Sequence, residues 1–223
     1  MSDGTQKGTT LAHEVLLPRR ASENRPGLIL LHGRGADEND LLALAEHLDP
    51  RFLVVSARAP LSLAPGFEWY RLGAIGEPDL PTLRSGLADL RRFVAEMVTR
   101  YSIDPARLFM LGFSQGAVMS CSYALMNPRD IAGVVALSGY IPTNAGLPFQ
   151  LDRLDGRGFF VAHGTLDAVI PVRFGRDSSE FLARTTAAVT YREYSVGHQI
   201  TLEILDDVAR WFAERPELAE TND

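Results

Sequence analysis

Short apolar runs alternate along this chain with longer segments in which apolar residues recur every three or four positions. The short runs cover residues 28–31, 52–55, 108–111, 131–137, 159–162 and 189–194, and their length and composition predict buried strands. The longer segments cover residues 41–48, 83–101, 117–126, 174–186 and 200–212, and their spacing predicts helices with one apolar face. The alternation predicts an α/β fold, with a mostly parallel central sheet flanked by helices on both faces.

Two segments depart from this alternation. Residues 11–17 partly alternate between apolar and polar, which predicts an antiparallel strand at the edge of the sheet. Residues 58–81 are predicted to be irregular, because prolines and glycines recur through them. The chain shows neither internal repeats nor low-complexity linkers. It is therefore interpreted as a single domain spanning residues 1–223, with flexible tails at roughly residues 1–10 and 214–223.

Composition narrows the possible functions. The hydrophobic content of 46% and charged content of 22% are those of an ordinary globular protein. A net charge of −6 argues against a nucleic-acid partner, which normally requires a basic surface. The single cysteine, Cys121, excludes a disulfide framework and a cysteine-rich metal site, and we expect no metal and a buried thiol. Neither a signal peptide nor a membrane span is evident, so we expect a cytoplasmic protein.

The segment GFSQG, residues 112–116, lies where a predicted strand gives way to a predicted helix. In a strand–turn–helix elbow, a serine between two glycines is exposed at the end of the sheet, and its backbone is strained. The helix that follows places its positive N-terminus beneath the serine. Ser114 is thus a candidate nucleophile, although a serine in a glycine-rich turn is the simpler alternative. A nucleophilic serine also requires a base, an acid that orients the base, and donors for the oxyanion.

Chain order selects the base and the acid. Three of the five histidines, His32, His163 and His198, follow predicted strands and face the same end of the sheet. In this class of fold the order along the chain is nucleophile, acid, histidine. Asp167, in the segment HGTLDAVIP of residues 163–171, follows a strand end and has apolar neighbours. His198 is the histidine that comes after it. Taken alone, Asp167 would be a solvated loop residue and His198 a helix cap.

The oxyanion donors are predicted to be backbone N–H groups. One belongs to Gln115, the residue after the nucleophile, and the other to Arg34, in the loop His32-Gly33-Arg34-Gly35 after an early strand. A tight turn without a catalytic role is the alternative for that loop. His32 is then interpreted as a residue that organises the loop rather than as the base.

With these residues in view, the chain resembles the compact carboxylesterase/phospholipase branch of the α/β-hydrolases, which is related to the acyl-protein thioesterases. The resemblance lies in LHGRGADEND (31–40), GFSQGAVMS (112–120), LSGYIP (137–142), HGTLDAVIP (163–171) and GHQI (197–200). It implies hydrolysis of esters or thioesters without a cofactor, by a triad of Ser114, His198 and Asp167, and it allows a homodimer. Gln199 departs from the resemblance, because many relatives carry an acidic residue after the histidine.

The substrate is predicted to be a small-molecule ester of small to medium acyl chain, which makes the protein a carboxylesterase. Few residues separate Ile141 from Gly158, too few for a separate cap domain, so we expect an open groove. Candidate substrate contacts are Phe67, Trp69 and Tyr70, unless these aromatic residues only pin their loop to the core. The alternatives are an acyl-protein or other acyl thioesterase or lysophospholipase, and a non-catalytic ligand-binding module on the same fold.

Overall fold

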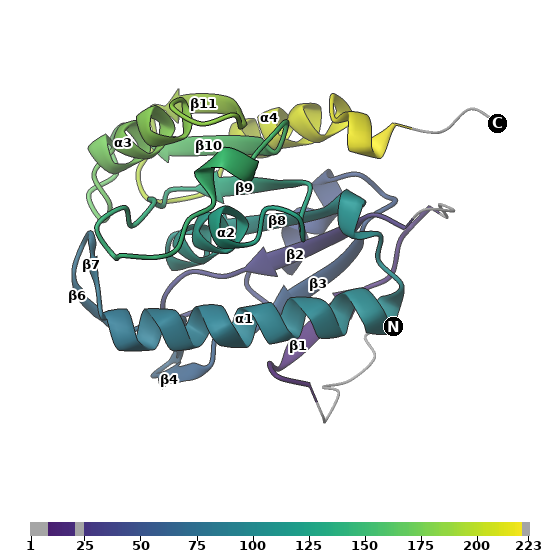
Figure 1. The fold of residues 1–223 in the computed structure, drawn as a ribbon, viewed down its shortest axis with the longest axis horizontal. Coiled ribbons are helices and arrows are strands. Elements are labelled where there is room, and N and C mark those ends of the chain that lie inside the picture. The colour runs from purple at the N-terminus through teal and green to yellow at the C-terminus, as the bar shows by residue number, and fades with distance from the viewer. Residues whose placement is uncertain (1–8, 21–24, 220–223) are drawn as a thin grey trace.

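The apolar runs form the strands of one seven-stranded sheet, in the order β1-β3-β2-β8-β9-β10-β11 (Figure 1). We describe residues 9–20 and 25–219 of a computed structural model. The strands are β1 (His13–Leu16), β2 (Gly27–Leu31), β3 (Leu53–Ala57), β8 (Leu108–Phe113), β9 (Gly133–Leu137), β10 (Gly158–Gly164) and β11 (Ala188–Tyr194). All neighbouring pairs are parallel except β1 and β3. The predicted parallel sheet and its antiparallel edge strand are both confirmed.

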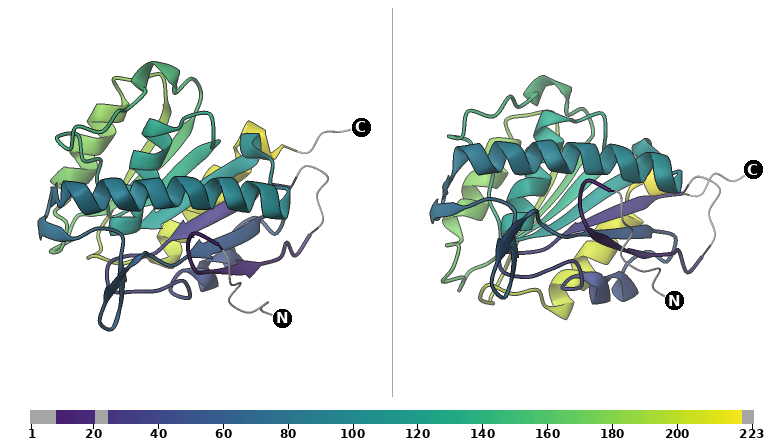
Figure 2. Two further views of the ribbon diagram at one scale, coloured as in Figure 1. Left: turned by 60° about the horizontal axis from the view of Figure 1, so that its bottom comes forward. Right: turned by 90° about the horizontal axis from the view of Figure 1, so that it is seen from below.

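Helices cover both faces of this sheet, which explains why β2, β3, β9 and β10 are buried along their whole length. One apolar core lies between the sheet and α1 (Leu80–Tyr101), α2 (Gln115–Met126) and α3 (Arg173–Leu182). A second core lies between the opposite face and α4 (Leu202–Ala213). Figure 2 shows α1 and α4 on opposite sides of the sheet. Because β2, β3, β8, β9, β10 and β11 are parallel, their carboxyl ends lie at one edge of the sheet.

Two local predictions are corrected by the structure. The segment 41–48 forms a 3-10 helix, η1 (Leu42–His47), and no side chain caps its start at Leu41. The segment 58–81 is not irregular. It folds into two hairpins, β4 (Leu61–Leu63) with β5 (Gly66–Glu68), and β6 (Leu72–Ala74) with β7 (Glu77–Pro78). Glycine explains the second hairpin, since Gly76 adopts a φ of 86° at its turn.

Part of the segment interpreted as a C-terminal tail packs against the core. Beyond α4 the chain forms another 3-10 helix, η4 (Pro216–Leu218), and Leu218 is only 2% exposed in the core beneath α4. The side chain of Arg107, in η2 (Pro105–Arg107), donates a hydrogen bond to the carbonyl of Glu217. At the other end, Thr10 is hydrogen-bonded to Glu96 of α1. The remainder of the predicted tails, residues 1–8 and 220–223, lies outside the described residues.

The edge of the sheet that carries the loops has no separate cap domain. Between β9 and β10 the only regular element is the 3-10 helix η3 (Leu151–Arg153). Of the helices within residues 9–20 and 25–219, none has the length and apolar character needed to cross a membrane.

Candidate active site

Ser114 lies on the predicted elbow between β8 and α2. Its φ of 54° and ψ of −117° are strained for a residue with a side chain. A Cβ atom at Gly112 would lie 2.2 Å from the carbonyl oxygen of Gly116, and one at Gly116 would lie 1.8 Å from that of Leu31. The two glycines are therefore needed because the elbow packs directly against its own turn and against β2.

Asp167 and His198 form a hydrogen-bonded pair. Nδ1 of His198 lies 2.7 Å from Oδ2 of Asp167, whose side chain is fully buried. The other carboxylate oxygen of Asp167, Oδ1, accepts hydrogen bonds from the backbone N–H groups of Val169 and Ile170 at 2.9 and 2.8 Å. Because a carboxylate can only accept, Nδ1 of His198 carries the proton, and Nε2 is the free basic nitrogen. The ring of Phe113 packs against the imidazole, with centroids 4.8 Å apart.

A cavity of about 280 Å³ brings these elements together at the carboxyl ends of the strands. Ser114, His198, Arg34 and Gln115 all line it, and Asp167 lies behind His198, outside the lining. Most of the remaining wall is apolar or aromatic; it is formed by Gly33, Tyr70, Leu72, Ile75, Phe113, Tyr140, Val169 and Ile170. Four of the five residues predicted for the triad and the oxyanion hole thus line the same cavity. The fifth, Asp167, is hydrogen-bonded to His198.

The two predicted oxyanion donors occupy suitable backbone positions. Gln115 is the first residue of α2, where an N–H group has no partner within the helix. Arg34 lies in a loop that β5 holds in place: Gly35 donates to the carbonyl of Phe67, and Phe67 donates to that of Ala36. The guanidinium of Arg34 also forms an ion pair with Glu68, at 2.9 Å. The loop is therefore fixed on its outer side by main-chain and side-chain bonds.

His32 organises this loop, as predicted. Its Nδ1 donates to the carbonyl of Gly33 at 2.7 Å, and its Nε2 accepts the N–H of Ala59 at 3.0 Å. Burial lowers the pKa of His32, which is consistent with a neutral imidazole that uses both nitrogens in the structure. His32 has no nitrogen left to act as a base.

Of the three aromatic residues predicted to contact substrate, only Tyr70 lines the cavity. Trp69 is fully buried, and its indole N–H donates to the carbonyl of His32 at 2.9 Å. Phe67 packs under the guanidinium of Arg58 and does not line the cavity. The sequence prediction missed Tyr140, in the segment LSGYIP. The rule that loops after strand ends form the site would have identified it, because Tyr140 follows β9.

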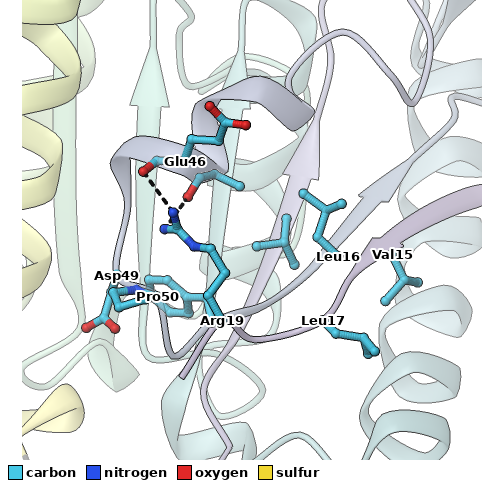
Figure 3. A pocket seen from close by; sticks show the side chains of 10 residues that line it. Val15, Leu16, Leu17, Arg19, Glu46, Asp49 and Pro50 are labelled. Carbon is cyan, nitrogen blue, oxygen red and sulfur yellow. Dashed lines mark hydrogen bonds between the residues drawn. The ribbon is translucent and has the colours of Figure 1, made fainter. Parts of the chain in front are cut away.

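A larger cavity, of about 330 Å³, lies elsewhere on the molecule (Figure 3). It is formed by the end of β1, the start of β3 and η1, and Arg19 crosses it to donate to the carbonyls of Ala45, Glu46 and Leu48. Its lining contains no serine, cysteine or histidine, so it offers neither a nucleophile nor an imidazole base. Within residues 9–20 and 25–219, no group of three or more potential ligands is placed to hold a metal ion.

Comparison with known proteins agrees with this geometry. Residues 13–214 match the phospholipase/carboxylesterase family. The chain is similar to an acyl-protein thioesterase 1 of Candida albicans, with 26% identity over 88% of this chain and 95% of the relative. It also resembles the crystal structure of a Bacillus cereus carboxylesterase, with a TM-score of 0.82, 27% identity, and coverage of 92% and 94% of the two chains. A carboxylesterase of Mesorhizobium loti, at 24% identity and a TM-score of 0.85 over 96% and 99%, shares the fold.

Proposed function

This chain belongs to the phospholipase/carboxylesterase family, and we propose that it is a serine carboxylesterase for esters of small to medium acyl chain. The observation that carries the proposal is the cavity at the strand ends. It is lined by the strained Ser114, by the His198 that is bonded to Asp167, and by the two residues whose N–H groups would bind an oxyanion.

The proposed reaction begins with attack of Ser114 Oγ on the ester carbonyl carbon, while Nε2 of His198 takes the hydroxyl proton. The carbonyl oxygen becomes an oxyanion, which the N–H groups of Gln115 and Arg34 stabilise. His198 then gives its proton to the departing alkoxide, and an acyl-enzyme remains. Water repeats the sequence: His198 removes its proton, the acyl group leaves as a carboxylic acid, and the proton returns to Ser114.

Burial makes Asp167 suited to its proposed role. Its side chain is fully shielded from water, so its attraction to the imidazolium that forms during attack is weakly screened. The two backbone N–H groups on Oδ1 fix the carboxylate plane and leave Oδ2 for His198. The dipole at the N-terminus of α2 favours the negative charge that develops beside Ser114.

The size of the cavity supports small to medium acyl chains. Sites for drug-sized ligands measure roughly 300–1,000 Å³, and this cavity, at about 280 Å³, lies just below that range. Its apolar wall suits an alkyl chain, whose burial is favoured by about 25 cal/mol per Å² of apolar surface.

A thioesterase activity is the second candidate, because the relative from Candida albicans is an acyl-protein thioesterase 1. Both reactions use the same nucleophile, base and oxyanion hole. They differ in the leaving group, so rates on matched oxygen and sulfur esters of the same acyl chain distinguish them.

The first experiment measures hydrolysis of p-nitrophenyl esters from acetate to decanoate beside matched thioesters. We expect turnover with a maximum at short or medium chains, and stoichiometric labelling by a fluorophosphonate. Ser114→Ala should abolish labelling and lower kcat by about 10⁴-fold or more. Ser122→Ala on the same helix is the matched control. The Ser122 hydroxyl is buried without a hydrogen-bond partner within the described residues, so its removal should leave turnover intact.

Absence of both turnover and labelling across the whole panel would overturn the proposal. Tight binding of an ester that an intact Ser114 does not hydrolyse would instead support a non-catalytic ligand-binding module.

A further inference from the structure

Asp167 has a second histidine beside it. Nε2 of His163 lies 3.5 Å from Oδ2 of Asp167, the same oxygen that accepts from His198, and 2.7 Å from the carbonyl oxygen of Ile170. His163 is 1% exposed and does not line the catalytic cavity. It occupies the end of β10, at the start of the segment that carries Asp167. The proposed reaction assigns no role to His163.

The surroundings of His163 determine where its proton lies. Both atoms near Nε2, the carbonyl oxygen of Ile170 and Oδ2 of Asp167, only accept hydrogen bonds, so Nε2 must carry the proton. Nδ1 is buried and has no hydrogen-bond partner within residues 9–20 and 25–219. An additional proton on Nδ1 would therefore lie in the interior without an acceptor. Burial accordingly lowers the pKa of His163, so the ring is a neutral N–H donor.

Helix α3 packs closely against the imidazole of His163 because residue 175 is a glycine. A Cβ atom at Gly175 would lie 2.6 Å from Nδ1 and 3.0 Å from Cβ of His163. Glycine at this position lets the helix approach closely and cover Nδ1, the ring nitrogen that has no hydrogen-bond partner within the described residues. The ring is thus held between α3 and the Asp167 segment, and its N–H points at that segment.

We propose that His163 is a positioning residue, which holds the Asp167 carboxylate and the turn that orients it against His198. Its N–H ties the carbonyl of Ile170 to the end of β10, while the N–H of the same Ile170 donates to Oδ1 of Asp167. The imidazole therefore completes the contacts around the carboxylate: Ile170 lies on one side, His198 on the other, and Nε2 of His163 is 3.5 Å from Oδ2. This role rests on the proposed function of the Asp167–His198 pair.

The test compares His163→Leu, which removes the N–H donor, with His163→Gln, whose amide can still donate to Ile170. We expect His163→Leu to lower kcat about 10²-fold, the effect of a small misplacement of a catalytic group, with KM nearly unchanged. His163→Gln should recover most of the loss. Labelling to completion with a fluorophosphonate counts the active sites, so that kcat refers to folded enzyme.

The pH profile separates positioning from a structural role. Asp167, His198 and Glu193 are the titratable groups that act on His163. If the carboxylate is held less closely, the imidazolium of the base is stabilised less, and the acid limb of kcat/KM should move to lower pH in His163→Leu. A merely structural residue would change the number of active sites and leave the limb in place.

Gly175→Ala provides an independent variant that keeps His163. Its Cβ should displace the ring, and we expect the same fall in kcat and the same shift of the acid limb. Glu180→Ala, at an exposed position on α3, is the control. Should His163→Leu fail to fold, Gly175→Ala decides the question.

Failure of this inference is distinguishable from failure of the proposed function. If the wild-type enzyme is active and both variants match it in kcat per labelled site and in pH profile, His163 does not position Asp167. If the wild-type enzyme hydrolyses nothing, proton NMR still reports the hydrogen-bonded Nδ1 proton of His198. That resonance should shift or broaden in His163→Leu, and an unchanged resonance overturns the proposal.

Discussion

Ser114 shares a positive backbone φ angle with two other serines. Among the described non-glycine residues, positive φ occurs at Ser102, Ser114 and Ser138. The N–H of Ser114 donates to the carbonyl of Leu137 at the end of β9, and that of Ser138 donates to Ala162 in β10. Each of these two strained turns is thus fastened to the next strand of the sheet. The strain at Ser114 is sustained because its hydrogen bond to Leu137 holds the turn against β9.

The two glycines of the elbow are predicted to be required for stability. Gly116→Ala should destabilise the protein by about 3 kcal/mol or more, because its Cβ would overlap the backbone of β2, which cannot yield without breaking the sheet. Urea unfolding measures the change. Gly197→Ala is the control, since its Cβ would come no closer than 3.9 Å to the carbonyl oxygen of Leu166, an ordinary van der Waals contact. Equal stability of Gly116→Ala and wild type would contradict the close packing of Gly116 against the backbone of β2.

The side chain of Gln115, at the start of α2, connects the elbow to the segment of Trp69 and Tyr70 that forms part of the cavity wall. Its carbonyl oxygen accepts the N–H of Trp69 at 2.9 Å, and its amide donates to the carbonyl of Tyr70 at 2.7 Å. The indole of Trp69 in turn donates to the carbonyl of His32 at the end of β2. Nucleophile, cavity wall and oxyanion loop therefore form one hydrogen-bonded unit. The segment that precedes β6 is tied to the catalytic elements, which opposes independent movement as a lid.

Gln115→Met tests this coupling. Methionine has a similar size but leaves the N–H of Trp69 and the carbonyl of Tyr70 buried without partners, and each orphaned group costs about 1–3 kcal/mol. We expect a loss of about 2–6 kcal/mol in the free energy of unfolding, the sum for the two groups, together with a lower kcat, because the oxyanion donor belongs to the same residue. Gln199→Met, at an exposed position beside the catalytic pair, is the matched control. A Gln115→Met enzyme with wild-type stability and kcat would refute the coupling.

For the whole molecule, three buried histidines make stability depend on pH in the range below neutrality. Burial is the largest cause that lowers the pKa of His13, His32 and His163 below the ordinary value of 6.5. Between that value and the lower folded-state pKa, the unfolded chain binds more protons than the folded one. The stabilisation is therefore complete above about pH 6.5 and is lost as the pH falls below it.

We accordingly predict that the urea midpoint stays level between about pH 8 and pH 7 and falls steadily toward pH 5. His163→Gln should show a shallower fall, because one of the three groups has been removed. Glu193, whose pKa an ion pair with Arg176 lowers from 4.5 to about 2, loses its contribution in a separate, more acidic range. A midpoint that is constant down to pH 5 would show that the histidines are not buried as described.

Much of this architecture could be predicted because it depends on local patterns. Runs such as residues 28–31 are apolar throughout, which suits strands covered on both faces, and the glycines at 112 and 116 mark a turn too tight for side chains. The hairpins within residues 58–81 were missed because their pairing depends on contacts with other segments. The bridge between Ala36 and Phe67, for example, joins two segments far apart in the sequence.

The order of the elements and the chemical types of the site residues follow from the linear chain, since periodicity and chain order are properties of the sequence. Which side chains share a cavity depends on the three-dimensional packing. In the folded protein Trp69 is buried, whereas Tyr70 and Tyr140 line the cavity. His163 lies beside Asp167. Such contacts depend on how β10, α3 and the strand-end loops pack in three dimensions, and the burial of each side chain follows from that packing.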